Sequence, residues 1–235
     1  MPKINQIVIL NGGYGSRVRS ISKNIPKCLI KIGGIPFLFH QLDLIKKAKI
    51  KNVVLCLGYK SEYVINFLKK NYKGLNIRFV VEKKKLGTGG ALINSLKYLK
   101  KNFFLTYGDS WLNINYYNLQ KIFFSKNKSL ITVVPSRIIK NHTANIYIKR
   151  GVIKDYNKKK INRNYEHIDY GLMIFKKKLF LNSKIKKIDL SFFISNFIKE
   201  NLIDYKIVYK KFYQIGDLKG IKELKDYYHI HHELP

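Results

Sequence analysis

The chain has 235 residues, 46% of them hydrophobic and 26% charged, which is the composition of a folded protein of one or two domains. This excludes a wholly disordered chain, and no apolar run reaches the roughly 18 residues that a membrane-spanning helix needs. The net charge of +32 is unusual and is compatible with a nucleic acid, a membrane surface or a polyanionic substrate as partner.

Strand and helix patterns alternate along the first half of the chain. Strands are predicted at 4–10, 52–57, 77–81 and 103–106, and helices at 36–47, 61–70 and 89–99. This alternation with short connections indicates a parallel sheet covered on both faces. Ligands bind such sheets beyond the carboxyl ends of the strands, so the loops at 11–17, 58–60, 82–90 and 107–112 are the candidate site.

The second half is more strand-rich. Helices are predicted at 116–124, 190–199 and 218–228, and strands at 129–134, 144–148, 152–156, 170–175 and 205–209. We therefore expect one α/β domain over residues 1–235, with a Rossmann-like, mixed and mostly parallel sheet, helices on both faces and a small antiparallel insertion. Residues 1–112, which carry the candidate loops, would form its first half and residues 113–235 its second.

The basic residues and the cysteines give weaker indications. Only six of the 46 basic residues are arginine, and lysines scattered along the chain are typical of ordinary surface positions rather than of a nucleic-acid reader. Cys28 and Cys56 lack the spacing of a disulfide framework or a zinc site. No signal peptide is visible, so a cytoplasmic location without membrane insertion is expected.

A glycine-rich turn follows the first predicted strand. Asn11-Gly12-Gly13-Tyr14-Gly15-Ser16-Arg17 leads on to Pro26-Lys27. Glycines let the backbone approach a polyphosphate, and Arg17 and Lys27 add positive charge for its oxygens. The turn is not a Walker A motif, because no Lys-Ser/Thr follows its last glycine, and it lacks the third glycine of a dinucleotide fingerprint. It predicts a phosphate-binding loop.

Five motifs in order along nearly the whole chain resemble those of the sugar-1-phosphate nucleotidylyltransferases, with the mannose- and heptose-1-phosphate guanylyltransferases as the nearest branch. Members of this family join a nucleoside triphosphate to a sugar 1-phosphate and release pyrophosphate. The motifs are the glycine-rich turn with 20–27, the run Glu82-Lys83-Lys84-Lys85-Leu86-Gly87-Thr88-Gly89-Gly90, then Tyr107-Gly108-Asp109, Asp169-Tyr170-Gly171 and Phe212-Tyr213-Gln214-Ile215-Gly216-Asp217.

The resemblance implies that residues 1–112 are the nucleotide-binding half and residues 113–235 the sugar-phosphate-binding half, with the following roles for single residues. Arg17, Lys27 and Asp109 would be catalytic, with Arg17 on the departing pyrophosphate, Lys27 on the α-phosphate or sugar side, and Asp109 on Mg²⁺. The sugar phosphate would bind Lys158, Asp169 and Gly171. The nucleotide would contact Leu10, Asn11, Gly12, Gly13, Gly15, Ser16, Arg17, Glu82, Gly87, Thr88 and Gly108.

The base is predicted from Glu82. A carboxylate suits guanine, whose N1–H and N2–H₂ groups are adjacent donors, better than uracil, which offers a single N–H. GTP is therefore favoured, and CTP and UTP stay open, because 32–34 and 56–60 also resemble the glucose-1-phosphate cytidylyltransferase branch.

Two motifs depart from the family. Asn157-Lys158 stands where a Glu-Lys pair is usual, and Gln214 stands where the family usually has an acidic residue. Asp217 follows the next glycine, in place of a small hydroxyl residue. Three arrangements stay open beside Asp109: Gln214 ligates the metal through its neutral amide oxygen, Asp217 ligates it, or Asp109 and the phosphates hold a single metal without a second side-chain ligand.

We expect an enzyme for nucleotide-sugar synthesis, serving capsule or lipopolysaccharide biosynthesis, with a nucleoside triphosphate, a mannose- or heptose-like sugar 1-phosphate and Mg²⁺. The family resemblance allows a homodimer. A cytidylyltransferase for a non-sugar phosphate is the rival enzyme. From the charge alone, the rival outside the enzymes is a nucleic-acid-binding protein, which would show steeply salt-dependent binding.

Overall fold

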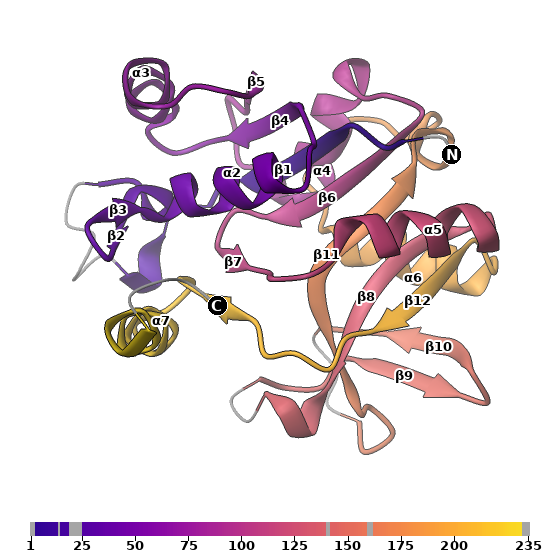
Figure 1. Ribbon diagram of the computed structural model, residues 1–235. Helices are drawn as coiled ribbons and strands as arrows, with labels where there is room; N and C mark the ends of the chain where they lie inside the picture. Colours follow the sequence, from indigo (N-terminus) through magenta and orange to yellow (C-terminus); the bar gives the residue numbers. More distant parts are fainter. Residues whose placement is uncertain (1–2, 14, 19–24, 140–141, 159–161, 232–235) are drawn as a thin grey trace.

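The computed structural model describes residues 3–13, 15–18, 25–139, 142–158 and 162–231 (Figure 1). Within these residues the fold is built on a nine-stranded mixed sheet. Its first-half strands are parallel and lie in the order β6-β1-β4-β5. They are β1 (Gln6–Asn11), β4 (Asn52–Leu57), β5 (Asn76–Val81) and β6 (Asn102–Tyr107).

The second half extends the same sheet. β11 (His167–Lys176) pairs antiparallel with β6 on one side and β8 (Ser129–Pro135) on the other, and β12 (Ile203–Ile207) pairs parallel with β8. The hairpin of β9 (Ile146–Lys149) and β10 (Val152–Tyr156) turns at two residues of positive φ, Arg150 and Gly151, as tight two-residue hairpins require. One sheet therefore joins both halves.

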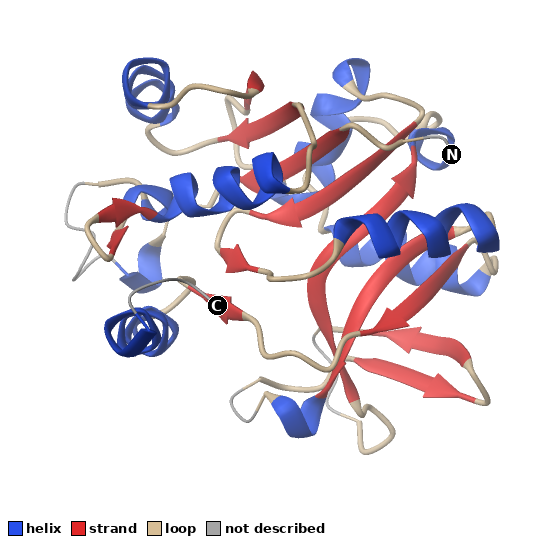
Figure 2. Ribbon diagram, in the orientation of Figure 1, coloured by secondary structure: helices blue, strands red, loops and turns tan. Residues whose placement is uncertain are grey.

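Helices cover both faces of the sheet (Figure 2). On one face lie α2 (Phe37–Lys47), α3 (Ser61–Asn71) and α5 (Tyr116–Lys126), and on the other α4 (Gly87–Ser95) and α6 (Leu190–Lys199). The position of β1 explains its continuous apolar run from Ile7 to Leu10. Ile7 and Ile9 belong to one hydrophobic cluster and Val8 and Leu10 to the other, so both faces of the strand are buried.

A third, smaller core brings the end of the chain to its beginning. α7 (Leu218–His231) buries Ile221 and Leu224 against Ile32, Trp111 and Ile215. The short strands of this region are β2 (Lys31–Ile32), β3 (Ile35–Pro36), β7 (Ser110–Trp111) and β13 (Tyr213–Gln214). The 3-10 turns of the chain are η1 (Ser16–Val18), η2 (Lys27–Leu29), η3 (Leu96–Tyr98), η4 (Ser136–Ile138) and η5 (Lys177–Phe180).

The predicted fold class is confirmed: the sheet is mixed and mostly parallel in its first half, with helices on both faces and an antiparallel portion in the second. Bounds differ locally. The helix predicted at 89–99 is α4 followed by η3, and the strand predicted at 170–175 is longer, as β11. The two-residue strands β2, β3, β7 and β13 were not predicted. Among the described residues, none of the helices has the length and apolarity to cross a membrane.

Candidate active site

The predicted ligand-binding loops meet at the carboxyl edge of the parallel strands. Because β1, β4, β5 and β6 run in the same direction, the loops that follow them come together there. They enclose a cavity of about 280 Å³. Its lining residues are Leu10, Asn11, Gly12, Gly13, Lys27, Glu82, Lys85, Gly87, Thr88, Ala91, Tyr107, Asp109 and Asp189.

A second hollow of about 430 Å³ lies on the other side of Lys27 and Asp109, which line both spaces. It brings Gly15 and Arg17 of the glycine-rich turn to the closing motif. Its lining residues are Gly13, Gly15, Arg17, Lys27, Asp109, Ser110, His142, Phe212, Gln214, Gly216 and Asp217. All three predicted catalytic residues therefore face one hollow.

The glycine-rich turn packs closely on Lys27. Gly15 has a φ of +64, and a Cβ there would lie 3.2 Å from the Cβ of Lys27. The backbone N–H of Val18 donates to the carbonyl of Gly15, which closes the η1 turn and presents Arg17 at the surface. Tyr14 and the side chain of Ser16 lie outside the described part of the chain. A side chain at position 15 would be strained both by φ and by space.

Lys27 and Asp109 form an ion pair. Lys27 Nζ lies 2.7 Å from Asp109 Oδ2, with side chains 14% and 33% exposed. Lys27 reaches the site from η2, directly after Pro26, and Asp109 follows β6. The ion pair places the Lys27 ammonium beside the Asp109 carboxylate where the two hollows meet. A carboxylate is a common ligand of Mg²⁺ in proteins.

Glu82 reaches into the cavity from the end of β5. Its Oε2 accepts a hydrogen bond from the backbone N–H of Leu86 at 3.1 Å. Its Oε1 lies over Gly12 and Gly58, where a Cβ on either glycine would overlap it. Burial raises the pKa of the Glu82 carboxyl, and the hydrogen bond from Leu86 and the charge of Lys85 oppose that rise. Gly12 thus makes room for Glu82.

The glycines after Leu86 hold two distant segments together. The backbone N–H groups of Gly89 and Gly90 both donate to the carbonyl of Ile188, at 3.0 and 3.1 Å. A Cβ on Gly87 would lie 2.6 Å from that same carbonyl oxygen. The loop that resembles a base-binding loop is therefore fixed to the chain just before α6 by close backbone contact.

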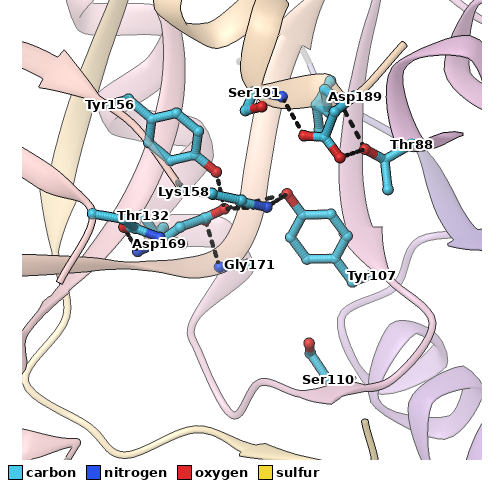
Figure 3. A network of polar contacts seen from close by, with 12 residues as sticks. Thr88, Tyr107, Ser110, Thr132, Tyr156, Lys158, Asp169, Gly171, Asp189 and Ser191 are labelled. Carbon is cyan, nitrogen blue, oxygen red and sulfur yellow. Dashed lines mark hydrogen bonds and ion pairs between the residues drawn. The ribbon is translucent and has the colours of Figure 1, made fainter. Parts of the chain in front are cut away.

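Asp189 is a cavity residue that the sequence analysis missed. It caps α6: its Oδ1 accepts from the Ser191 N–H at 2.9 Å, and its Oδ2 accepts from the Thr88 hydroxyl at 3.0 Å (Figure 3). Burial raises the pKa of the Asp189 carboxyl, but the hydrogen bonds from Ser191 and Thr88 and the charge of Lys158 together outweigh it, and the net shift of the pKa is downward. The Asp-Leu-Ser sequence before a predicted helix was a capping signal that could have drawn attention to it.

The predicted sugar-phosphate residues form a polar network (Figure 3). Asp169 Oδ2 accepts from the hydroxyls of Tyr156 at 2.8 Å and Tyr107 at 3.2 Å, and its Oδ1 accepts from the Gly171 N–H at 3.0 Å. Lys158 Nζ donates to the Tyr107 hydroxyl at 3.1 Å and lies 3.9 Å from Asp169. The Asp169 side chain is only 4% exposed, so it faces its own chain, whereas that of Lys158 is 36% exposed.

Gly171 shapes this network from the backbone. Its φ is +98, and the register of β11 against β8 shifts between Asp169 and Met173. A Cβ on Gly171 would lie 3.4 Å from the Tyr107 ring. The irregular strand therefore turns Asp169 inward, where it meets Tyr107 and Tyr156. Neither tyrosine was predicted as a site residue, although Tyr107 begins the Tyr107-Gly108-Asp109 motif.

The closing motif lies beside Asp109. β13 pairs antiparallel with β7, and the N–H of Ile215 donates to the carbonyl of Asp109 at 2.9 Å. His142, also unexpected, stacks on Phe212 with ring centroids 5.0 Å apart. No group of three His, Cys, Asp or Glu side chains suited to a metal occurs among the described residues. Asp109 and the amide oxygen of Gln214 nevertheless approach the same point over Gly216.

Gly108 and Leu10 complete the predicted set. The N–H of Gly108 donates to the carbonyl of Leu10 at 2.9 Å, and a Cβ on Gly108 would overlap the Asn11 side chain. The end of β6 is thereby drawn against the end of β1, which aligns Asp109 with the glycine-rich turn.

Comparison with known proteins agrees with this arrangement. The family model described as "Nucleotidyl transferase" matches residues 6–210. The chain is 30% identical to a D-glycero-alpha-D-manno-heptose 1-phosphate guanylyltransferase of Campylobacter jejuni over 226 residues, which are 96% of this chain and 98% of that protein. A mannose-1-phosphate guanyltransferase of Yarrowia lipolytica is 35% identical over 136 residues, 56% of this chain and 37% of that protein.

Solved structures share the fold. HddC from Yersinia pseudotuberculosis complexed with GMP-PN superposes with a TM-score of 0.80 at 24% identity, covering 96% of this chain and 100% of that one. The inositol-1-phosphate CTP transferase from T. maritima superposes with a TM-score of 0.77 at 20% identity, covering 93% and 92%. Proteins with different bases and acceptors thus have this fold, so base and acceptor depend on side chains.

Proposed function

The chain belongs to the nucleotidyl transferase family, and we propose that it joins GTP to a mannose- or heptose-like sugar 1-phosphate to give a GDP-sugar and pyrophosphate. The observation that carries the choice of GTP is the carboxylate of Glu82 in the cavity, with Oε1 over Gly12 and Gly58. A carboxylate there accepts from the two adjacent donors of guanine. The similarity over 96% of the chain to a heptose-1-phosphate guanylyltransferase supports the same choice.

Arg17 and Lys27 act on the phosphates in this proposal. An oxygen of the sugar phosphate attacks the α-phosphorus of GTP, and the bond to the β-phosphate oxygen breaks, so negative charge develops on the leaving pyrophosphate. Arg17, exposed in the second hollow, binds that leaving group. Lys27, at the junction of both hollows, lowers the repulsion between the attacking and the attacked phosphates.

Asp109 and Gln214 fit a magnesium ion. Both present oxygens, the ligand type that Mg²⁺ prefers, and Asp109 Oδ2 and Gln214 Oε1 each come within 3.3 Å of the position that a Cβ on Gly216 would take. When bound, Mg²⁺ neutralises charge on the phosphate oxygens. Asp217 is less suited to direct ligation, because the atoms nearest to the Cβ position of Gly216 belong to Gln214 and Asp109, whereas the oxygens of Asp217 are held by Gly220 N–H and Gln214 Nε2.

Lys158 binds the sugar phosphate in this proposal, and Asp169 positions it. Burial works against the charge on Lys158, yet Tyr107 and Asp169 raise its pKa, so it is a permanent cation. Asp169 fixes Tyr107 and Tyr156 around it, and because its side chain is only 4% exposed we propose that it acts on the sugar phosphate through these residues rather than by direct contact.

The same network argues against choline phosphate as the acceptor. Quaternary ammonium groups bind in cages of aromatic rings with a nearby carboxylate. Tyr107, Tyr156 and Asp169 make such a cage, but Lys158 Nζ occupies it, 4.8 and 5.8 Å from the two ring centroids. A second cation would be repelled.

The product is proposed to serve as a glycosyl donor for a surface polysaccharide of the capsule or lipopolysaccharide type. Such donors are made from cytoplasmic nucleotides, so a cytoplasmic location is part of the proposal. The homodimer expected from the family remains a prediction for sizing of the purified protein.

The test is pyrophosphate release with GTP, CTP, UTP and dTTP, each paired with mannose 1-phosphate, a heptose 1-phosphate, glucose 1-phosphate and choline phosphate in the presence of Mg²⁺. We expect the highest kcat/KM with GTP and one of the first two acceptors. Preference for CTP or UTP would refute the reading of Glu82. Absence of turnover across the whole panel, with tight and salt-sensitive binding of DNA or RNA, would favour the nucleic-acid-binding alternative.

A further inference from the structure

The side chain of Gln214 is held at both ends of its amide. Its Oε1 accepts a hydrogen bond from the backbone N–H of Gly216, and its Nε2 donates to Asp217 Oδ2 at 2.8 Å. The opposite amide orientation would set the NH₂ group against the Gly216 N–H and the amide oxygen against a carboxylate, two repulsive contacts. The orientation of Gln214 is therefore determined by its neighbours.

Asp217 is itself fixed in place. Its Oδ1 accepts from the N–H of Gly220 at 2.8 Å, in the first turn of α7. Gly220 has no side chain, and a Cβ there would overlap the Gln214 amide. The carboxylate of Asp217 thus connects α7 to Gln214 by two hydrogen bonds, each of its oxygens accepting one.

The oriented amide oxygen faces Asp109. Gln214 lies opposite Ser110 in the β7–β13 ladder, and the N–H of Ile215 binds the carbonyl of Asp109. Asp109 Oδ2 lies 3.3 Å from the Cβ position of Gly216, and Gln214 Oε1 is closer to that position still. Only a glycine at 216 leaves the two oxygens this shared space.

We propose that Asp217 is a positioning residue, which holds Gln214 so that its neutral Oε1 and the Asp109 carboxylate together bind the catalytic cation. This rests on the metal-dependent transfer proposed above and deepens it. The negative charge of the closing motif therefore lies at position 217, where the carboxylate orients Gln214 through a hydrogen bond. It does not lie at position 214, where a carboxylate would ligate the cation itself. A site with one ligating carboxylate binds the free cation weakly and depends on phosphate oxygens for the rest of its affinity.

The arrangement can be tested by exchanging the two charges. Gln214→Glu and Asp217→Asn are each nearly isosteric, and in the double variant the new amide at 217 would donate to the new carboxylate at 214. The double variant then keeps all the hydrogen bonds of the motif, and its carboxylate lies at position 214, on the side chain that ligates the cation. Asp217→Asn alone leaves a single acceptor oxygen at 217, so it keeps the hydrogen bond from Gly220 N–H or the one from Gln214 Nε2 but not both, and Gln214→Glu alone sets two carboxylates against each other.

Cation binding can be measured without turnover by Tb³⁺ luminescence. Trp111 is the only tryptophan of the chain and pairs with Tyr213 in the β7–β13 ladder, so it is close enough to sensitise Tb³⁺ bound at Asp109. Tb³⁺ alone is titrated into each variant and then displaced with Mg²⁺. Asp217→Asn should weaken binding about 10-fold or more, the usual effect of losing the partner that orients a ligand, and the double variant should bind more tightly than the wild-type chain.

The matched control is Glu223→Gln, which removes a carboxylate from the same helix, where it pairs with Lys211 at 2.8 Å. Its Tb³⁺ affinity should stay within about twofold of the wild-type value, provided that the weaker binding of Asp217→Asn is not caused merely by the loss of one negative charge from this helix. Unchanged Tb³⁺ affinity in Asp217→Asn would overturn the proposal. A loss of Tb³⁺ affinity in Asp217→Asn without a loss in Gln214→Ala would also overturn it, since Asp217 would then ligate the cation directly. Base preference is measured separately with the four triphosphates, so a failure of the GTP proposal is distinguishable.

Discussion

Removing the Tyr156 hydroxyl measures how much one hydrogen bond of the buried network around Asp169 contributes to the free energy of unfolding. Tyr156→Phe removes the 2.8 Å hydrogen bond to Asp169 and keeps the ring, which is 1% exposed, so no cavity opens. A hydrogen bond to a charged group contributes about 1.5–3 kcal/mol, and the buried carboxylate cannot replace it with bulk water. We expect a loss of about 2 kcal/mol, which for a domain of this size corresponds to a Tm lower by about 4–8 °C.

Tyr72→Phe is the matched control. The Tyr72 hydroxyl donates to Asp43 at the same 2.8 Å, but Asp43 is exposed and regains water when the hydroxyl is lost. Its expected cost is at most about 1 kcal/mol. Thermal unfolding of both variants under identical conditions measures the difference, and the KM for the sugar phosphate should rise in Tyr156→Phe only, because Asp169 then holds Tyr107 and Lys158 less firmly. Equal Tm losses in the two variants would refute the reasoning.

Three further predictions concern the site itself. Arg17→Ala and Asp109→Ala should each abolish pyrophosphate release and leave thermal unfolding nearly unchanged; near-wild-type turnover in either would contradict the assigned role. Glu82→Gln should lower kcat/KM for GTP by about 10- to 100-fold. Because burial raises the pKa of Glu82 and only the ionised form accepts from both guanine donors, GTP binding should weaken as pH falls, beginning above the usual range for a glutamate; the pH profile of kcat/KM should lose this limb in the variant. Gly87→Ala, at a φ of +73 with Ile188 oxygen 2.6 Å from the new Cβ, should lower the Tm, although alanine favours helices elsewhere.

Continuous apolar strands and their glycine-rich ends made the parallel half of the fold predictable. The parallel pairing of β1 with β4 and β6 is what strands buried on both faces indicate, and the loops after parallel strands must meet at one edge. Lys27 and Asp109 were placed at the site by motif alone, and the structure brings them into contact at 2.7 Å. Local sequence was sufficient here because chain direction determines where the loops lie.

The residues that sequence analysis missed are positioned by contacts across long sequence separations. Tyr156 meets Asp169 through an irregular β11, and Asp189 meets Thr88 through α6, a separation of 101 residues. The strands β7 and β13 have two residues each, too short for any periodic pattern. Their pairing depends on the small core around Trp111, which no local pattern reveals.

The basic residues behind the net charge of +32 are of two kinds, those that line the site and those scattered along the rest of the chain. Lys27 is paired with Asp109, and Lys158 lies 3.9 Å from Asp169, so two of the cations that the motifs placed are locally balanced. Arg17 is exposed in the hollow that these residues line. A phosphate that enters therefore meets an exposed guanidinium first, while contact with Lys27 requires competition with a carboxylate. In the proposed function the scattered lysines raise the local concentration of anionic substrates in general, and the paired ones hold the phosphates for reaction.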